Sequence, residues 1–117
     1  MPVKSYQDLI AWQRAMELVV EVYEMTKGFP KDERFGLTNQ VRRAAVSVPS
    51  NIAEGQGRGV GAEFAHHLRI AQGSLQEVET QVILGQRLGF TRGGAELLSM
   101  ADETGRLLRG LHKTIRC

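Results

Sequence analysis

The sequence predicts an all-α protein folded as an antiparallel four-helix bundle with up-down-up-down topology. Apolar residues recur at spacings of three and four along four segments, which is the pattern of one buried helical face. Short breaks rich in glycine or proline separate these segments, and short links favour antiparallel neighbours. No run alternates apolar and polar residues at every second position, so we expect no strand. One domain is expected to span residues 1–117.

The first predicted helix runs from about residue 9 to residue 26. Ser5 and Asp8 have the spacing of a capping pair before it. Gly28 suits a helix C-terminus, and Pro30 ends the helix because proline cannot continue one. The buried stripe predicted for this helix consists of Leu9, Trp12, Met16, Val19 and Tyr23.

The second predicted helix begins near residues 32–37 and reaches about Gly55. Pro49 lies within it, where it removes a backbone hydrogen bond and favours a bend. Two shorter helices that meet at Val48-Pro49 satisfy the same pattern, so both alternatives stay open. The predicted stripe consists of Leu37, Val41, Ala45, Val48 and Ile52.

Glycines at positions 55, 57, 59 and 61 are expected to form a flexible link to the third helix. They do not predict a phosphate-binding loop, because that motif needs a Gly-Lys-Ser/Thr sequence and a preceding strand. The third helix is predicted from residue 62 to about residue 88, and the fourth follows a turn at residues 91–94. Their stripes are predicted to be Phe64, Leu68, Ala71, Leu75, Val78 and Val82, and then Leu97, Ala101, Thr104, Leu108, Leu111 and Ile115.

Composition places the chain among folded proteins. Apolar residues make up 42% and charged residues 24%, with a formal net charge of +2. This charge permits nucleic-acid binding but does not require it, because a phosphate-binding surface depends on local clustering. Cys117 is the single cysteine, and we see neither a signal peptide nor a membrane-spanning run. We therefore expect a cytoplasmic protein with no membrane partner.

No constellation of residues predicts an enzyme, a metal site or a cofactor. His66 and His67 are adjacent and point about 100° apart on a helix, so they cannot hold one metal ion together. Glu63 lies four residues before His67, which fits a helix ion pair. The serines have no recognisable histidine and aspartate partners. We expect neither catalysis nor a small-molecule substrate.

A polar stripe on the second helix is the first candidate site. It lies away from the apolar face of that helix. One interpretation is a solvated surface. The other is a polar seam, in which Arg43 and Glu54 pair with groups on another helix or subunit and fix its register. The stripe consists of Gln40, Arg43, Ser47, Asn51 and Glu54.

A basic strip on the fourth helix is the second candidate site. No acidic residue follows Glu103, so nothing nearby in the sequence is expected to offset the strip. Cations near a helix C-terminus complement the helix dipole, which is one explanation. The other is a phosphate-contacting surface, with Arg42, Arg58 and Arg69 as further candidates. The strip consists of Arg106, Arg109, Lys113 and Arg116.

Several apolar residues lie outside the predicted stripes. Apolar residues on so many sides of a helix indicate a second buried face, so we expect a homo-oligomer. These residues are Ile10, Val20 and Val22 on the first helix and Ile70 and Ile83 on the third.

Residues 42–55, Arg-Arg-Ala-Ala-Val-Ser-Val-Pro-Ser-Asn-Ile-Ala-Glu-Gly, resemble the central motif of a known family. It is the family of four-helix-bundle proteins encoded in intervening sequences of bacterial 23S ribosomal RNA genes. The resemblance covers nearly the whole chain, although the last helix matches only in its general pattern. Further matching residues are Asp8-Leu9, Trp12, Phe29-Pro30, Glu33-Arg34, Gly36-Leu37, Glu63-Phe64, Leu68, Ala71, Gly73-Ser74-Leu75, Glu77, Glu79-Thr80-Gln81 and Leu88-Gly89-Phe90.

The resemblance implies a small bundle that associates as a homopentamer. A related branch, the accessory variability determinant of diversity-generating retroelements, is a basic pentamer that binds RNA and a reverse transcriptase. The resemblance thus implies RNA or a nucleic-acid enzyme as the partner. We expect a non-enzymatic oligomer that binds RNA or a nucleoprotein. The alternatives are a structural or protein-interaction module with no nucleic-acid role, and an enzyme that works at a subunit interface.

Overall fold

The computed structural model contains four α-helices and no strand among residues 5–59 and 61–116, the part of the chain that the structure describes. The all-α prediction is confirmed. Cys117 and the side chain of Arg116, both named above, lie outside this part. No helix within it is long and apolar enough to cross a membrane. The elements in chain order are the 3-10 helix η1 (Tyr6–Asp8), α1 (Ile10–Thr26), the 3-10 helix η2 (Lys31–Glu33), α2 (Leu37–Gly57), α3 (Ala62–Arg87) and α4 (Ala95–Arg116).

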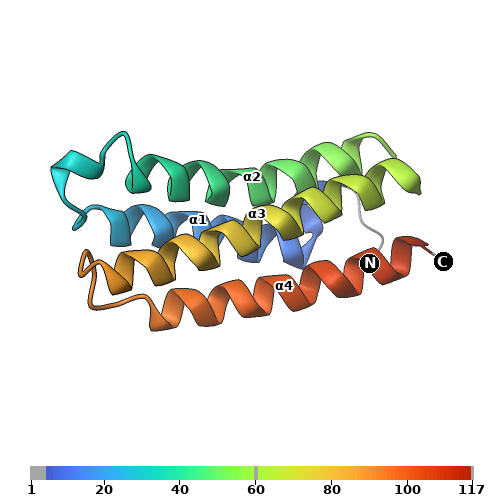
Figure 1. The fold of residues 1–117 in the computed structure, drawn as a ribbon. Helices are drawn as coiled ribbons and strands as arrows, with labels where there is room; N and C mark the ends of the chain where they lie inside the picture. Colours follow the sequence, from blue (N-terminus) through green and yellow to red (C-terminus); the bar gives the residue numbers. More distant parts are fainter. Residues whose placement is uncertain (1–4, 60, 117) are drawn as a thin grey trace.

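The four helices lie side by side along one long axis (Figure 1). α1 packs against α2 and α4, and α3 packs against the same two helices, so the four surround one core. The α1–α2 and α3–α4 connections lie at one end of the molecule (Figure 1). The last turn of α2 and the first turn of α3 lie at the other end (Figure 1).

Aliphatic residues of α2, α3 and α4 form most of the core. The predicted stripes of α2 and α3 are confirmed, because every one of their members is buried. α4 buries the first four residues of its predicted stripe, while the last two, Leu111 and Ile115, are partly buried. Long aliphatic side chains at spacings of three and four were therefore sufficient to find the inner faces of these helices.

The stripe predicted for α1 is wrong by one helical position. Met16 and Tyr23 are 41% and 40% exposed, and the other three members are only partly buried. The face that meets the core contains two alanines, whose small side chains let α1 approach its neighbours closely. Val22, expected on a second face that another subunit would cover, lies inside the core with no exposed surface. The buried residues of α1 are Ala11, Ala15, Leu18, Val22 and Thr26.

Ser5 and Asp8 form the predicted capping pair, but they cap η1 rather than α1. The amide of Gln7 donates to Ser5 Oγ over 3.1 Å, and the amide of Ser5 donates to Asp8 Oδ2 over 3.2 Å. Leu9 then adopts extended backbone angles, and α1 begins at Ile10. The capping signal thus marked a short turn that precedes the helix.

α2 runs through Pro49 as one helix, so the alternative of two shorter helices is wrong. Pro49 has no amide hydrogen, and the carbonyl of Ala45 therefore lacks its usual helical donor. The Pro49 ring is buried and lines an apolar hollow with Trp12 and Val19 of α1. Burial of the ring offsets part of the lost hydrogen bond.

Gly55 lies inside α2 and is buried, so it is not part of the predicted flexible link. A Cβ atom at this position would lie 2.7 Å from His67 Cβ and 3.1 Å from Phe64 Cδ1. The missing side chain therefore lets α2 and α3 come close together. The turn itself uses Gly59 and Gly61, whose φ angles of 106° and 87° favour glycine.

Phe29 joins the two connections at the other end of the molecule. Its ring centroid lies 5.6 Å from that of Phe90, which follows α3. The Phe29 ring also rests on Gly85, where a Cβ atom would lie 2.9 Å from Phe29 Cζ. The α1–α2 and α3–α4 connections are thereby held against each other by one buried aromatic side chain.

We predict that Gly55→Ala lowers the free energy of unfolding by about 1–3 kcal/mol, because the new methyl group overlaps His67 and Phe64. Gly73→Ala is the matched control, since Gly73 lies within α3 and a Cβ atom there would meet nothing within 4 Å. Alanine favours a helix more than glycine, so this control should be unchanged or more stable by up to about 1 kcal/mol. Urea denaturation measures both. Equal unfolding free energies for the two variants would contradict the close approach at Gly55.

Candidate nucleic-acid interface and the Asn51 network

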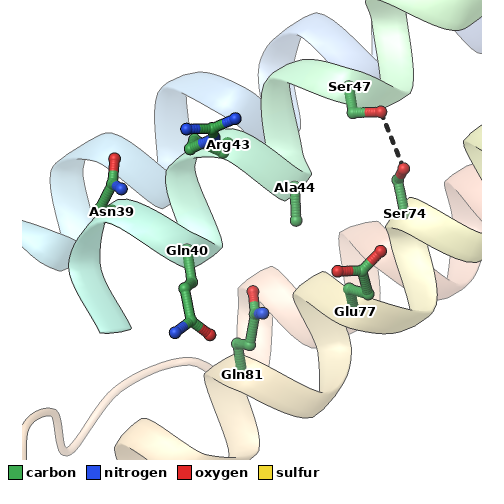
Figure 2. A pocket seen from close by; sticks show the side chains of 8 residues that line it. All are labelled: Asn39, Gln40, Arg43, Ala44, Ser47, Ser74, Glu77 and Gln81. Carbon is green, nitrogen blue, oxygen red and sulfur yellow. Dashed lines mark hydrogen bonds between the residues drawn. The ribbon is translucent and has the colours of Figure 1, made fainter. Parts of the chain in front are cut away.

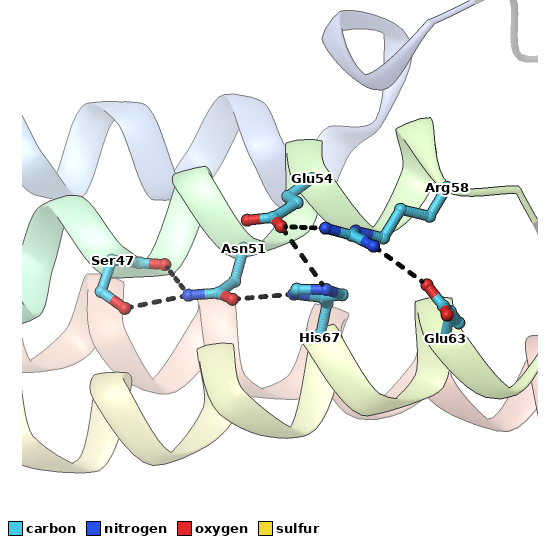
Figure 3. A network of polar contacts seen from close by, with 6 residues as sticks. All are labelled: Ser47, Asn51, Glu54, Arg58, Glu63 and His67. Carbon is cyan, nitrogen blue, oxygen red and sulfur yellow. Dashed lines mark hydrogen bonds and ion pairs between the residues drawn. The ribbon is translucent and has the colours of Figure 1, made fainter.

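Asn51 lies at the centre of a chain of hydrogen bonds between α2 and α3 (Figure 3). Its Nδ2 donates to the carbonyl oxygen of Ser47 over 2.9 Å and to Ser47 Oγ over 3.0 Å. Its Oδ1 lies 3.0 Å from Nδ1 of His67 on α3. Ser47 Oγ lies 2.8 Å from Oγ of Ser74, also on α3. We call Ser47, Asn51, His67 and Ser74 the Asn51 network.

The network determines which nitrogen of His67 carries a proton. A backbone carbonyl oxygen can only accept, so the NH2 group of Asn51 must face Ser47. Asn51 Oδ1 then faces His67, and because it also can only accept, Nδ1 of His67 must donate. Removing the Asn51 side chain would leave this half-buried donor without an acceptor.

A chain of polar contacts continues from His67 through charged side chains towards solvent (Figure 3). His67 Nε2 lies 3.9 Å from Glu54 Oε2, and Arg58 Nη2 donates to the same oxygen over 3.0 Å. Arg58 Nη1 lies 3.5 Å from Glu63 Oε2. The pKa of Arg58 is raised, chiefly by the hydrogen bond with Glu54 and then by the charges of Glu54 and Glu63. The side chains of Glu54, Arg58 and Glu63 are each more than half exposed, so the pairs that Arg58 forms contribute little to stability.

Gln40 and Arg43 of the predicted polar stripe, unlike Ser47 and Asn51, are not members of the Asn51 network. They line a groove whose opposite side is formed by Glu77 and Gln81 of α3 (Figure 2). No ion pair joins Arg43 to any carboxylate that the structure describes. Pairing of Arg43 with another subunit stays a prediction.

Sequence reasoning missed the part that His67 plays. The expected ion pair between Glu63 and His67 is wrong, because Glu63 lies against Arg58 instead. One signal was available. Asn51 and His67 each directly precede a core residue, so each borders the apolar face through which α2 meets α3.

The basic strip of α4 is only partly free of acidic neighbours. Arg106 pairs with Asp102, so the expectation that nothing nearby offsets the strip is wrong. The acid precedes the cation by one turn, which is the spacing of a helix ion pair. Arg109 and Lys113 are exposed and form no ion pair with a residue in the described ranges. The fourth member, Arg116, has its side chain outside those ranges.

Arg42 is held in the contact between α1 and α2, and its role as a phosphate ligand stays a prediction. Its Nε donates to Thr26 Oγ1 over 2.8 Å, and its guanidinium carbon lies 4.5 Å from the centroid of the Tyr23 ring. Thr26 in turn donates to the carbonyl of Val22 over 2.8 Å. Arg42 was a candidate because the sequence does not show which cations are used between helices. Arg58, another candidate, is also paired, with Glu54 and Glu63.

Arg109 and Arg69 both line a groove between α3 and α4, which we call the α3–α4 groove. A Cβ atom on Gly105 would lie 3.3 Å from Arg109 Nη1. The glycine therefore leaves room for the guanidinium to lie back towards α3. Arg69 is exposed and forms no ion pair within the described part of the chain. The polar residues that line the groove are Arg69, Gln72, Gln76, Glu79 and Arg109.

The histidines and acids are dispersed. Across the described ranges, no three His, Cys, Asp or Glu side chains are grouped so that they could hold a metal ion. The rings of His66 and His67 lie edge to face with centroids 5.6 Å apart. This arrangement supports packing between the two rings.

The fold and these contacts define a class of protein: small four-helix proteins in which a hydrogen-bonded polar network joins the second and third helices. The sequence profile described as 23S rRNA-intervening sequence protein matches residues 7–110. The chain belongs to this family, and the resemblance inferred from residues 42–55 is confirmed. No curated protein sequence matches the chain.

The contacts explain why residues 42–55 form a motif. Arg42 binds α1 through Thr26. Asn51, together with Ser47, binds α3, and Gly55 brings the backbones of α2 and α3 together. The motif therefore holds α2 to both of its neighbours.

Proposed function

We propose that the protein is a non-enzymatic, ring-forming helical bundle that binds RNA or a nucleic-acid enzyme as an accessory. The observation that carries the RNA part is the α3–α4 groove. Arg69 of α3 and Arg109 of α4 both line it, and neither pairs with a carboxylate in the described ranges. Lys113 follows one turn later on α4. Such a group of unpaired cations suits contacts with successive phosphates, and a family named for 23S ribosomal RNA intervening sequences supports an RNA-related role.

The proposal includes the antiparallel up-down-up-down arrangement and a cytoplasmic location. The positions of the helix connections in Figure 1 and the packing of each helix on its two neighbours support the arrangement. A single cysteine in 117 residues supports the location, because proteins of oxidising compartments commonly rely on disulfides.

Two separate apolar surfaces support assembly as a ring. The first consists of Met16, Val20, Tyr23 and Val46, on α1 and α2, which are 40–58% exposed. The second is on α3, where Ile70 and Leu84 are 38% and 44% exposed and lie on one side of the helix, about four turns apart. Contact between two different surfaces of identical chains is heterologous and generates a ring when the rotation closes. Five subunits follow from the family resemblance and not from these surfaces.

A structural or protein-interaction module with no nucleic-acid role is the second candidate. The two apolar surfaces favour it, since they bind a protein without needing phosphate. Salt dependence separates the candidates. Phosphate binding weakens steeply as salt rises, because counterions are released on binding. Contact through apolar surface weakens little.

We predict that Arg109→Ala combined with Lys113→Ala weakens binding to unrelated single-stranded RNAs about equally. The slope of log affinity against log salt should flatten by about 1.4, because each lost single-strand contact removes about 0.7. Fluorescence anisotropy across a potassium chloride series measures both quantities.

Arg14→Ala is the control, because it removes a cation that already pairs with Glu17 and Glu103. This control should keep the parent slope. An unchanged affinity in the folded Arg109/Lys113 variant would contradict the α3–α4 groove as the site. A parent protein without salt-dependent RNA binding would favour the interaction module.

We also predict that Val20→Asp lowers the molar mass measured by light scattering at micromolar concentration. Val20 is 58% exposed beside Met16 and Tyr23, so a carboxylate there would have to be desolvated in a subunit contact. Ile10→Asp is the control. Ile10 is also 58% exposed on α1, but its neighbours one turn later are the polar residues 13 and 14, so the mass should not change. A monomeric parent protein would contradict the ring.

A further inference from the structure

We infer that Phe35 is a stacking platform for a base of single-stranded RNA, at the end of the bundle where the α1–α2 and α3–α4 connections meet. This inference rests on the proposed RNA binding. It gives that binding a second contact site, remote in sequence from the basic strip, and a preference for single strands over duplexes.

Phe35 is the most exposed of the large hydrophobic residues in the described part of the chain. It is 83% exposed, whereas the next, Ile10 and Val20, are 58% exposed. Aromatic side chains dominate the energetics of cores and interfaces through the large area that they bury. A ring that contributes almost nothing to its own core has this area available for a partner.

The backbone around Phe35 presents the ring from an ordered turn. The amide of Gly36 donates to the carbonyl of Glu33 over 2.9 Å. The Glu33 carboxylate accepts a hydrogen bond of 2.9 Å from the amide of Leu37, the first residue of α2. Because this turn is already fixed by hydrogen bonds, little backbone freedom is lost when a base stacks on the ring.

Arg34 contacts the Phe35 ring and adds charge to the platform. Its guanidinium carbon lies 4.8 Å from the ring centroid, within the range of a cation–π contact. A guanidinium can cover one face of a ring while the other stays open to a base. Arg34 is itself exposed, so its remaining N–H groups can donate to the phosphate of the stacked nucleotide. Aromatic faces combined with cations are the usual means of binding single strands without sequence preference.

Basic residues outnumber acidic ones around the platform. The connecting segments, residues 27–36 and 88–94, together with Arg87, the last residue of α3, contain five basic and two acidic residues. They lie at one end of the molecule (Figure 1), and the contact of Phe29 with Phe90 holds them together. Lys27 pairs with Glu24, and the other four cations form no ion pair with a described residue. The five basic residues are Lys27, Lys31, Arg34, Arg87 and Arg92.

This environment favours a nucleic acid over a protein partner. Apart from Tyr23, whose ring is covered by the Arg42 guanidinium, the other exposed large hydrophobic residues near this end are aliphatic: Leu88, and Ile83 and Leu84 in the last turn of α3. Phe35 is therefore an aromatic ring that has cations in the same connecting segments and contacts one of them, Arg34. A base with a charged backbone matches both properties. Only a single strand offers an unstacked base, because the bases of a duplex are already stacked on each other.

Phe35→Ala tests the platform, since replacing so exposed a residue should leave the fold intact. It should weaken binding of a fluorescein-labelled oligoadenylate of about 12 nucleotides by roughly 5- to 150-fold, the equivalent of one lost base–aromatic stack. Phe35→Trp should restore binding, because an indole offers a stacking face. Leu88→Ala is the matched control: this aliphatic residue at the same end is 54% exposed, and its loss should change affinity less than about twofold.

Two measurements separate stacking from charge. Duplex RNA of equal length should bind Phe35→Ala and the parent protein alike. The salt slope of Phe35→Ala should equal that of the parent, since no cation is removed, whereas the Arg109/Lys113 variant flattens it. In Phe35→Trp, the oligoadenylate should also quench more tryptophan emission than in the parent protein, whose single tryptophan is Trp12.

The possible failures are distinguishable. Equal oligoadenylate affinities for Phe35→Ala and Leu88→Ala, with parent binding intact, would overturn the platform and leave the α3–α4 groove standing. A lower molar mass for Phe35→Ala would also overturn it, by assigning the ring to a contact between subunits. Absence of any RNA binding by the parent protein would overturn the proposed function and the platform together.

Discussion

The close contact of α2 with α3 is the constraint on which the rest of the structure depends. Gly55 permits it, because a side chain at that position would collide with His67. Asn51 then specifies it, because both its NH2 group and its Oδ1 have partners at fixed positions. Apolar contacts are non-directional and hold helices together without choosing a register. Sliding α3 along α2 would break the bonds to His67 and Ser74 at the same time.

This constraint separates the residues that build the protein from those proposed to bind a partner. Residues 42–55, which identify the family, fix α2 between α1 and α3 through Arg42, Asn51 and Gly55. Phe35 and Arg109, from which RNA binding is argued, lie outside that motif, on the α1–α2 connection and on α4. Family membership therefore accounts for the architecture, while the surfaces proposed to bind a partner lie outside the motif.

The sequence predicted the inner faces of α2 and α3 because large aliphatic residues mark them at helical spacing. It failed on α1, where two of the five buried residues are alanines and Met16 stays outside. For the polar stripe it found Asn51 but not His67, since a partner 16 residues away depends on how two helices are aligned. It also gave no sign of Phe35, because the exposure of a ring in a connection depends on the conformation of the turn.

A double-mutant cycle on Asn51 and His67 tests the central claim most directly. The unfolding free energies of the parent protein, Asn51→Ala, His67→Ala and the double variant are measured by urea denaturation. If the Asn51 network sets the alignment of α2 and α3, the two changes should be coupled by about 1–3 kcal/mol, with the double variant less destabilised than the sum of the single ones. Additivity within about 0.5 kcal/mol would contradict the account.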